Sequence, residues 1–147
     1  MIEAVIFDWG GTLSHWVPQE RVPEFWRASA QAVDPDRVEE LAAHLLTAEE
    51  AVWAQVRGAQ KSGKLEDIVR AAAAAHEIEF AEDMFAAAPG SYFEAWELEL
   101  HHKADALPML AALKSMGLHT GLLSNTHWPR HFHEELLERD GLHEAVA

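Results

Sequence analysis

One carboxylate near the N-terminus is placed where an enzyme could use it in chemistry. Asp8 directly follows an apolar run over residues 4–7 and is soon followed by Gly10, Gly11 and Thr12. A short apolar run that ends in a glycine turn is typical of a strand buried on both faces of a parallel sheet. Because ligands of open α/β sheets bind beyond the carboxyl ends of such strands, we expect Asp8 to contact a ligand there. The same residues also fit a plain strand end, with a capping Asp and a glycine turn.

A hydroxyl and an amide follow a second apolar run, in the C-terminal part of the chain. Residues 118–123 lead directly into Ser124 and Asn125. A strand over residues 118–123 that returns parallel to the first strand would place its C-terminal loop beside the loop of Asp8. The two loops would then form one site.

These two stretches resemble, in this order, the first two motifs of the haloacid dehalogenase superfamily of hydrolases and phosphotransferases. The first motif is an apolar strand that ends in a nucleophilic Asp, matched by Asp8, and closes with Gly-Thr, matched by Gly11 and Thr12. The second is an apolar strand that ends in Ser or Thr, matched by Ser124. The interval between Asp8 and Ser124 suits the branch with a helical cap after the first strand. The resemblance implies an α/β, Rossmann-like core with a partial parallel sheet and an inserted all-helical cap.

The resemblance also implies a role for each matched residue. Asp8 would attack phosphorus, or another electrophile, and form a covalent intermediate. A Mg²⁺ ion would bind the Asp8 carboxylate and the backbone carbonyl of Gly10, and it would neutralise charge on the transferred group. The substrate would be a small phosphorylated or phosphonate metabolite. Its phosphate would be bound by the Ser124 hydroxyl and by backbone N–H groups, at the positions Gly11, Thr12, Ser124 and Asn125.

The residue at position 10 departs from the family pattern. Family phosphatases usually carry an Asp there, which protonates the leaving group and then activates water, whereas this chain has Gly10. Such acid–base catalysis is worth about a hundred- to ten-thousandfold, so an alkyl phosphate should be a poor substrate. Members that cleave phosphonoacetaldehyde also lack this Asp and use a cap lysine; Lys61 and Lys64 are the candidates, although both come late in the chain. Dehalogenase members usually carry Tyr at this position, which argues against halide displacement.

The third and fourth family motifs have no counterpart before Ala147. They are a Lys and a pair of acids that completes the metal site. We therefore expect a truncated enzyme, part of a longer protein, that is inactive or nearly so in this form. The alternative is a non-catalytic fragment that serves as a binding or interaction module, which Gly10 and the missing motifs favour. A reading frame that continues into those motifs would favour the enzyme.

The composition restricts the possible partners. The 147 residues carry a net charge of −14, and 49% of them are hydrophobic. This charge argues against nucleic acid and anionic membranes, because both attract basic surfaces. No apolar run approaches the length of a membrane span. The absence of cysteine excludes disulfides and thiolate metal sites, and the N-terminus does not resemble a signal peptide, so we expect a cytoplasmic protein.

The elements that hold the two loops divide the chain into a core and a cap. We expect a partial core over residues 1–14 and 104–147, and a helical cap over residues 15–103. Because a shortened core would leave sheet edges unpaired, a homodimer is a further hypothesis. Capping signals and apolar stripes predict helices at 23–33, from Asp34-Pro35-Asp36 to Arg57 with a stop at Gly58, 65–75, 81–98 with a break at Pro89-Gly90, 105–116 and 129–140.

Histidines and tryptophans give less specific signals. Ten histidines suggest a metal site, but Pro129 interrupts the helical spacing between His127 and His131. Trp16 and Trp26 fit ordinary packing residues, and Gly58 to Lys64 fits a solvated loop. We interpret the adjacent pair His101 and His102 as a hinge or surface feature, and His127, His131 and His133 as surface histidines.

Overall fold

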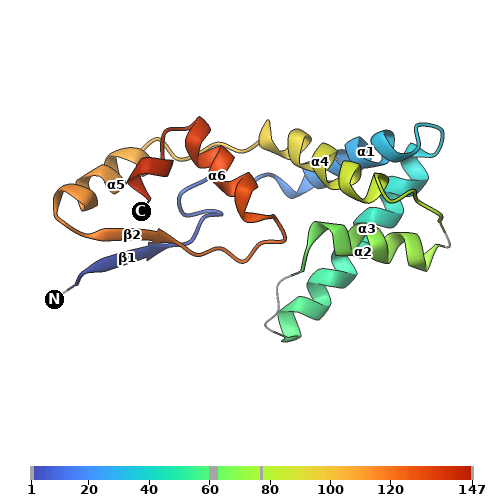
Figure 1. Ribbon diagram of the computed structural model, residues 1–147, viewed down its shortest axis with the longest axis horizontal. Helices are drawn as coiled ribbons and strands as arrows, with labels where there is room; N and C mark the ends of the chain where they lie inside the picture. Colours follow the sequence, from blue (N-terminus) through green and yellow to red (C-terminus); the bar gives the residue numbers. More distant parts are fainter. Residues whose placement is uncertain (1, 60–62, 77, 147) are drawn as a thin grey trace. The chain divides into compact units, whose positions relative to one another are not determined.

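The computed structural model describes residues 2–59, 63–76 and 78–146, which form two units (Figure 1). The core unit comprises Met1–Val17, Leu100–Asn125 and Pro129–Ala147. The helical unit comprises Pro18–Glu99 and Thr126–Trp128. The three residues after Asn125, which the sequence-based division assigned to the core, thus belong to the helical unit.

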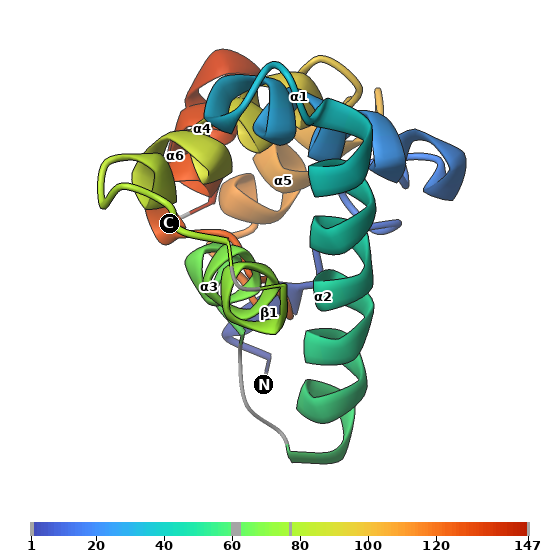
Figure 2. The ribbon, with the colours of Figure 1, turned by 90° about the vertical axis from the view of Figure 1, so that its right-hand side faces the viewer.

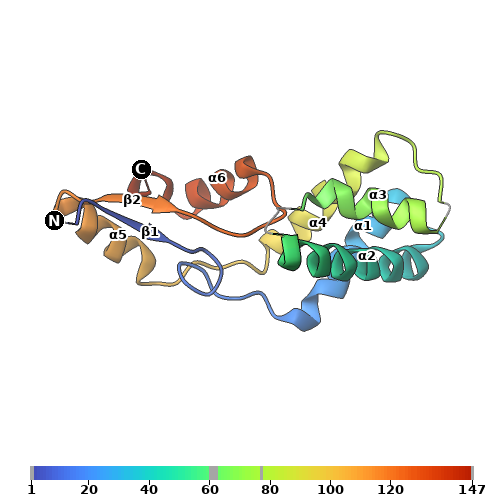
Figure 3. The same ribbon diagram turned by 90° about the horizontal axis from the view of Figure 1, so that it is seen from below.

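The core unit is built on two parallel strands, β1 (Ala4–Phe7) and β2 (His119–Leu122) (Figure 3). Their register pairs each residue of one strand with one of the other, over the whole length of both. Helix α5 (Ala106–Ser115) precedes β2, and helix α6 (Arg130–Arg139) and a 3-10 turn (His143–Ala145) follow it. The parallel pair and the helices confirm the α/β fold class predicted from the sequence.

Glycines end both helices of the core unit. Gly117 follows α5 with φ 74°, and Gly141 follows α6 with φ 70°. Residues with a side chain rarely adopt this left-handed conformation, so glycine is favoured where a helix stops in this way. Both stop signals predicted from the sequence are confirmed.

One face of the two-stranded sheet is covered and the other is not. Thr120 is buried and donates its hydroxyl to the carbonyl of Ala145 at 2.7 Å. Ile6 is 68% exposed, and its side chain lies over Gly121 on the opposite face. The prediction that β1 is buried on both faces is therefore wrong for the described residues, because no described element covers Ile6. The apolar run alone could not distinguish these cases, since alternate residues point to opposite faces.

The helical unit contains four α-helices after a 3-10 turn at Gln19–Arg21 (Figure 2). No strand occurs among its described residues, as the sequence predicts. Helix α1 packs against both α2 and α4, and α3 packs against α2 and α4. The four helices are α1 (Val22–Val33), α2 (Val38–Ala59), α3 (Leu65–Ala75) and α4 (Met84–Glu97).

The largest differences from the predicted helices concern α2 and α4. Helix α2 begins at Val38 rather than after Pro35, because the Asp34 carboxylate accepts the N–H of Asp36 at 3.1 Å in a separate turn. It also continues beyond Arg57, through the predicted stop. Helix α4 is not broken at Pro89 but passes through it, since a proline removes one N–H donor without forcing a helix to end.

A carboxyl group is buried among aromatic rings inside the helical unit. Glu49 is 7% exposed, and its carboxylate accepts the Nε1–H of Trp26 at 2.6 Å. Burial raises the pKa of Glu49, and hydrogen bonds from Trp26, Trp53 and Tyr92 partly offset this rise. Folding therefore shifts the titration of Glu49 to higher pH, because its pKa is raised.

Glu49→Gln should remove a pH dependence from the stability of the helical unit. Since folding raises the Glu49 pKa, this carboxyl stabilises the fold most below its unfolded value of 4.5 and loses that contribution as pH rises through the folded value. Glutamine keeps an oxygen for Trp26 without the charge. At neutral pH, we expect the free energy of unfolding of the variant to exceed that of wild type by about 1 kcal/mol. The two free energies should converge near pH 4. Urea unfolding across this pH range measures the difference in unfolding free energy, with exposed Glu50→Gln as the control. A difference that does not change with pH would contradict the raised pKa of Glu49.

Candidate active site

The turn after β1 is organised around one backbone carbonyl. The Trp9 carbonyl accepts the N–H groups of Thr12 at 3.0 Å, Leu13 at 2.9 Å and Ser14 at 3.1 Å. Gly11 adopts φ 75°, which a residue with a side chain rarely does. The chain therefore reverses tightly within a few residues of the Asp8 carboxylate.

The register of the strands brings the two predicted loops to one end of the sheet. Phe7 pairs with Leu122, and its carbonyl accepts the next N–H of the second strand, that of Leu123, at 2.9 Å. Asp8 and Ser124 therefore leave the sheet at the same end. Asp8 is exposed and accepts the Trp9 N–H on its Oδ1 at 2.8 Å, while Ser124 is half-buried and Asn125 and Thr12 are exposed.

The ring of Trp16 covers the glycine turn. A Cβ atom added at Gly10 would lie 2.9 Å from a carbon of this ring, and one added at Gly11 would lie 2.3 Å from its Nε1. Real Cβ atoms do not approach so closely, so any side chain here must displace Trp16. Trp16 is 76% exposed. It therefore covers the turn, whereas the sequence suggested an ordinary packing residue.

Two segments that are distant in sequence pair beside this turn. The N–H of His15 donates to the carbonyl of His101 at 2.9 Å, and the N–H of Lys103 donates to the carbonyl of Leu13 at 2.8 Å. Ser14 lies between these bonds, in a bridge with His102. The segment that leaves the core unit and the segment that returns to it are thus joined by backbone hydrogen bonds.

This pairing places a lysine that the sequence analysis did not single out. The Lys103 ammonium donates to the carbonyl of Gly11 at 2.5 Å. The next N–H, that of Thr12, donates to the Trp9 carbonyl, so the peptide group between Gly11 and Thr12 is held at both ends. The proximity depends on the pairing of distant segments, which no local pattern reveals. Of the lysines considered from the sequence, Lys61 lies outside the described residues and Lys64 is exposed.

Behind the turn, Trp9 packs against two histidines. Trp9 is 3% exposed, and its ring centroid lies 5.3 Å from that of His102 and 4.5 Å from that of His133. Nδ1 of His102 lies 2.5 Å from Oδ2 of Asp140. Hydrogen bonds from Arg139, and then from His102, lower the pKa of Asp140 to about 2. Burial lowers the pKa of His133 to about 4, so this ring is neutral at pH 7.

Several histidines lie elsewhere than the sequence suggested. The His102 side chain is 5% exposed, and His127 and His133 are buried or half-buried. The interpretation of His127 and His133 as surface residues is therefore wrong. For His102 the surface alternative is wrong, which leaves the hinge alternative, whereas His101 and His131 are exposed as expected. The reason is tertiary packing against aromatic rings, which histidine spacing does not encode.

The residues that follow Asn125 are anchored in the helical unit. The Trp128 ring lies 5.1 Å from Tyr92, 5.4 Å from Phe93 and 5.0 Å from Trp96, measured between centroids. The carbonyl of His127 accepts the N–H of Leu65 at 3.2 Å. The loop that carries Ser124 therefore continues into an aromatic cluster of the other unit.

The described residues contain no group of three or more His, Cys, Asp or Glu side chains that could hold a metal ion. The donors at the turn are the Asp8 carboxylate and the backbone carbonyl of Gly10. Both are oxygen ligands, the type that Mg²⁺ prefers, and this ion commonly retains several waters beside one or two carboxylates. The donor set is thus compatible with a Mg²⁺ ion completed by water and substrate oxygens.

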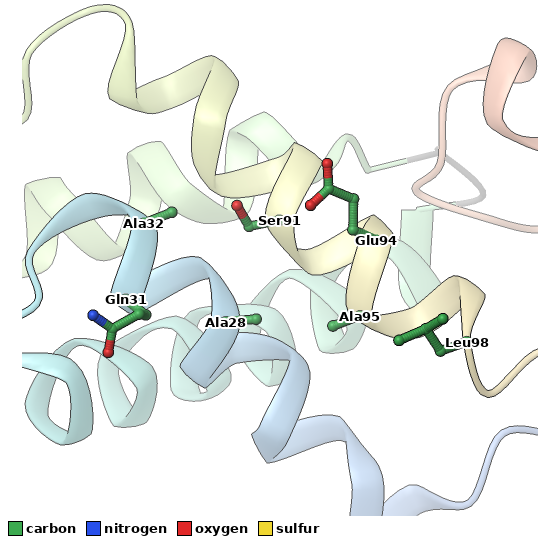
Figure 4. Close-up of a pocket in the computed structure, with 7 residues that line it drawn as sticks. All are labelled: Ala28, Gln31, Ala32, Ser91, Glu94, Ala95 and Leu98. Atoms are coloured by element: carbon green, nitrogen blue, oxygen red, sulfur yellow. The ribbon is translucent and has the colours of Figure 1, made fainter.

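A groove of about 420 Å³ lies in the helical unit, between α1 and α4 (Figure 4). None of the predicted site residues lines it. Small side chains let the two helices approach closely there. The lining residues are Ala28, Gln31, Ala32, Ser91, Glu94, Ala95 and Leu98.

A family model described as haloacid dehalogenase-like hydrolase matches residues 2–146. No curated protein matches the chain significantly. Within the part of the chain that the structure describes, no helix has both the length and the apolarity that crossing a membrane requires.

Two solved structures share this fold over 99% of the chain. One is described as a dehalogenase, with 19% sequence identity and a TM-score of 0.51. The other is described as a predicted phosphoglycolate phosphatase from Haemophilus somnus 129pt, with 16% identity and a TM-score of 0.51. The chain spans 60% of the length of each of these proteins.

Proposed function

This chain belongs to the haloacid dehalogenase-like hydrolases, and from that premise we propose that it is part of a hydrolase acting on small phosphorylated or phosphonate metabolites. Asp8 is the proposed nucleophile. One observation carries the proposal: the parallel register of β1 and β2 brings Asp8 and Ser124 to the same end of the sheet. A carboxylate and a hydroxyl at this position can act on one ligand.

In the proposed reaction, a carboxylate oxygen of Asp8 forms a bond to phosphorus, and the bond from phosphorus to the leaving oxygen breaks. The leaving group departs with the electron pair of that bond. The Ser124 hydroxyl donates a hydrogen bond to a phosphoryl oxygen, and backbone N–H groups near Gly11 and Asn125 bind the others, since the Thr12 N–H already donates to the Trp9 carbonyl. The exposure of the Asp8 carboxylate supports this role, because a nucleophile must be accessible.

A Mg²⁺ ion is the proposed cofactor. The Asp8 carboxylate and the Gly10 carbonyl would hold it, with water completing its coordination. When bound, the ion would neutralise negative charge on the phosphoryl group. The ion would thus offset the repulsion between the substrate phosphate and a chain whose net charge is −14.

Gly10 limits the second half of the reaction. Hydrolysis of the covalent intermediate needs a base that activates water, and glycine has no side chain to serve as one. We therefore propose that the intermediate forms on substrates with a good leaving group and then persists. The same observation favours the alternative, a non-catalytic module that binds a ligand or partner, because Trp16 occupies the space into which an acid at position 10 would point.

The structural neighbours include proteins described as a dehalogenase and as a phosphatase. We favour phosphoryl transfer over halide displacement for this chain. Family dehalogenases usually carry a Tyr two residues after the nucleophile, and this chain has Gly10 there.

The 147-residue chain should hydrolyse para-nitrophenyl phosphate very slowly in the presence of Mg²⁺. Nitrophenolate leaves without a proton, so we expect release of up to about one equivalent per chain. Steady-state turnover should then be at least about a hundredfold below that of a phosphatase with an acid at position 10. Absorbance of nitrophenolate measures both phases, with Asp8→Asn as the blank. Rapid turnover that depends on Asp8 would contradict the role given to Gly10.

A further inference from the structure

Lys103 is held at the glycine turn, and none of the acidic side chains that the structure describes forms an ion pair with it. Its ammonium donates to the Gly11 carbonyl, and no carboxylate among the described residues lies within ion-pair distance of it. The side chain is half-buried. A partly desolvated ammonium without an opposite charge is unfavourable unless it meets an anion or ordered water.

The other basic side chains of the core unit have partners elsewhere. Arg130 pairs with Glu134 at 2.6 Å, and Arg139 pairs with Asp140 at 2.7 Å. Lys114 donates to the carbonyl of Glu144 at 2.7 Å, on the last part of the chain. Among the described residues of the core unit, Lys103 is therefore the basic side chain whose bond reaches the Asp8 turn.

We propose that Lys103 is a positioning and anion-binding residue of the Asp8 site, an inference that rests on the function proposed above. One N–H of its ammonium fixes the peptide group between Gly11 and Thr12, whose other end is fixed by the Trp9 carbonyl. The two remaining N–H groups of the ammonium are donors for an anionic oxygen. The substrate class that this arrangement favours is a small dianion such as a phosphate or phosphonate.

The arrangement also accounts for an anionic ligand on an acidic chain. With 25 acidic and 11 basic side chains, the field of the whole molecule repels a phosphate. The Lys103 cation, held on the Gly11 carbonyl of the turn, reverses this field locally. The effect of Lys103 should therefore depend on its charge as well as on its contact with Gly11.

Binding of inorganic phosphate to the full chain tests the proposal. Titration calorimetry in the presence of Mg²⁺ would compare wild type with Lys103→Met, Lys103→Arg and Lys114→Met. We expect Lys103→Met to weaken phosphate binding about ten- to hundredfold, since a charge-assisted hydrogen bond is lost. Lys103→Arg should recover most of the affinity, and Lys114→Met, which also loses a bond to a carbonyl, should bind as wild type does.

Salt dependence separates a charge effect from a merely structural one. Phosphate affinity of wild type should fall as ionic strength rises, and this dependence should be weaker in Lys103→Met. A structural defect would instead lower the melting temperature without phosphate in both Lys103 variants.

The outcomes distinguish this inference from the function on which it rests. If Ser124→Ala weakens phosphate binding and Lys103→Met does not, the role of Lys103 is overturned and the Asp8 site stands. If neither variant alters binding, or if wild type does not bind phosphate, the role of Lys103 and the proposed function of the Asp8 site are both overturned. Weakened binding in Lys103→Met, with recovery in Lys103→Arg, would support the proposal.

Discussion

Asp8→Asn should abolish covalent labelling of this chain by acetyl phosphate, with a loss of roughly a thousandfold or more. Acetate is a good leaving group, so attack on phosphorus needs the nucleophile and the donors that orient the phosphate. Asparagine preserves the shape of the side chain but does not provide an anionic oxygen. The Trp9 N–H still finds an acceptor in the amide oxygen, so the turn should keep its geometry.

Intact mass spectrometry measures the label as one added phosphoryl group. Because Gly10 provides no base for hydrolysis, the labelled form should accumulate in wild type in the presence of Mg²⁺. Hydroxylamine should remove it, as expected of an acyl phosphate. The matched control is Asp105→Asn, since Asp105 is also exposed and makes no side-chain hydrogen bond at the start of α5. Equal labelling of Asp8→Asn and wild type would exclude Asp8 as the nucleophile.

Trp26→Ala should cost the helical unit about 3–5 kcal/mol of stability, the largest effect we expect from one core substitution. The indole is fully buried, and its centroid lies 4.4 Å from the Tyr92 ring. Its removal leaves a cavity between α1 and α4. It also removes the N–H that now donates to the buried Glu49 carboxyl at 2.6 Å, and the loss of this hydrogen bond adds to the cost.

Two matched variants separate these costs. Trp26→Phe keeps much of the ring but loses the N–H, so it should destabilise less than Trp26→Ala. Trp16→Ala removes a tryptophan that is 76% exposed, and it should change the free energy of unfolding by about 0.5 kcal/mol or less. Urea unfolding followed by the helical circular dichroism signal measures all three. Equal effects of Trp16→Ala and Trp26→Ala would contradict the packing described here.

Local sequence signals predicted the elements that depend on local chemistry. The strand before Asp8, the helix over Leu65–Ala75 and the stops at Gly117 and Gly141 all follow from apolar runs and glycine conformations. A helix boundary differed from the prediction where a side chain formed a hydrogen bond with a backbone N–H outside the helix. Asp34 bonds within its own turn, and α2 therefore starts later than its capping signal suggests.

The candidate site was predictable in part. Asp8 and Ser124 each follow an apolar strand, and a parallel pairing of those strands was enough to place both at one end. Lys103 and Trp16 could not be placed in this way. Their positions depend on the pairing of the segments around Ser14 and His102, which are distant in sequence. The burial of His102 likewise depends on Trp9 and Asp140, which belong to different segments.

The backbone hydrogen bonds of His15 and Lys103 join the two chain segments that flank the insertion Pro18–Glu99. An insertion whose ends are already tied together imposes little additional entropy on its host, whatever its length. The helical unit can therefore be exchanged during evolution for a longer, shorter or differently folded segment while β1 and β2 keep their register. Such an exchange would leave the loops after β1 and β2, which carry Asp8 and Ser124, on an unchanged scaffold.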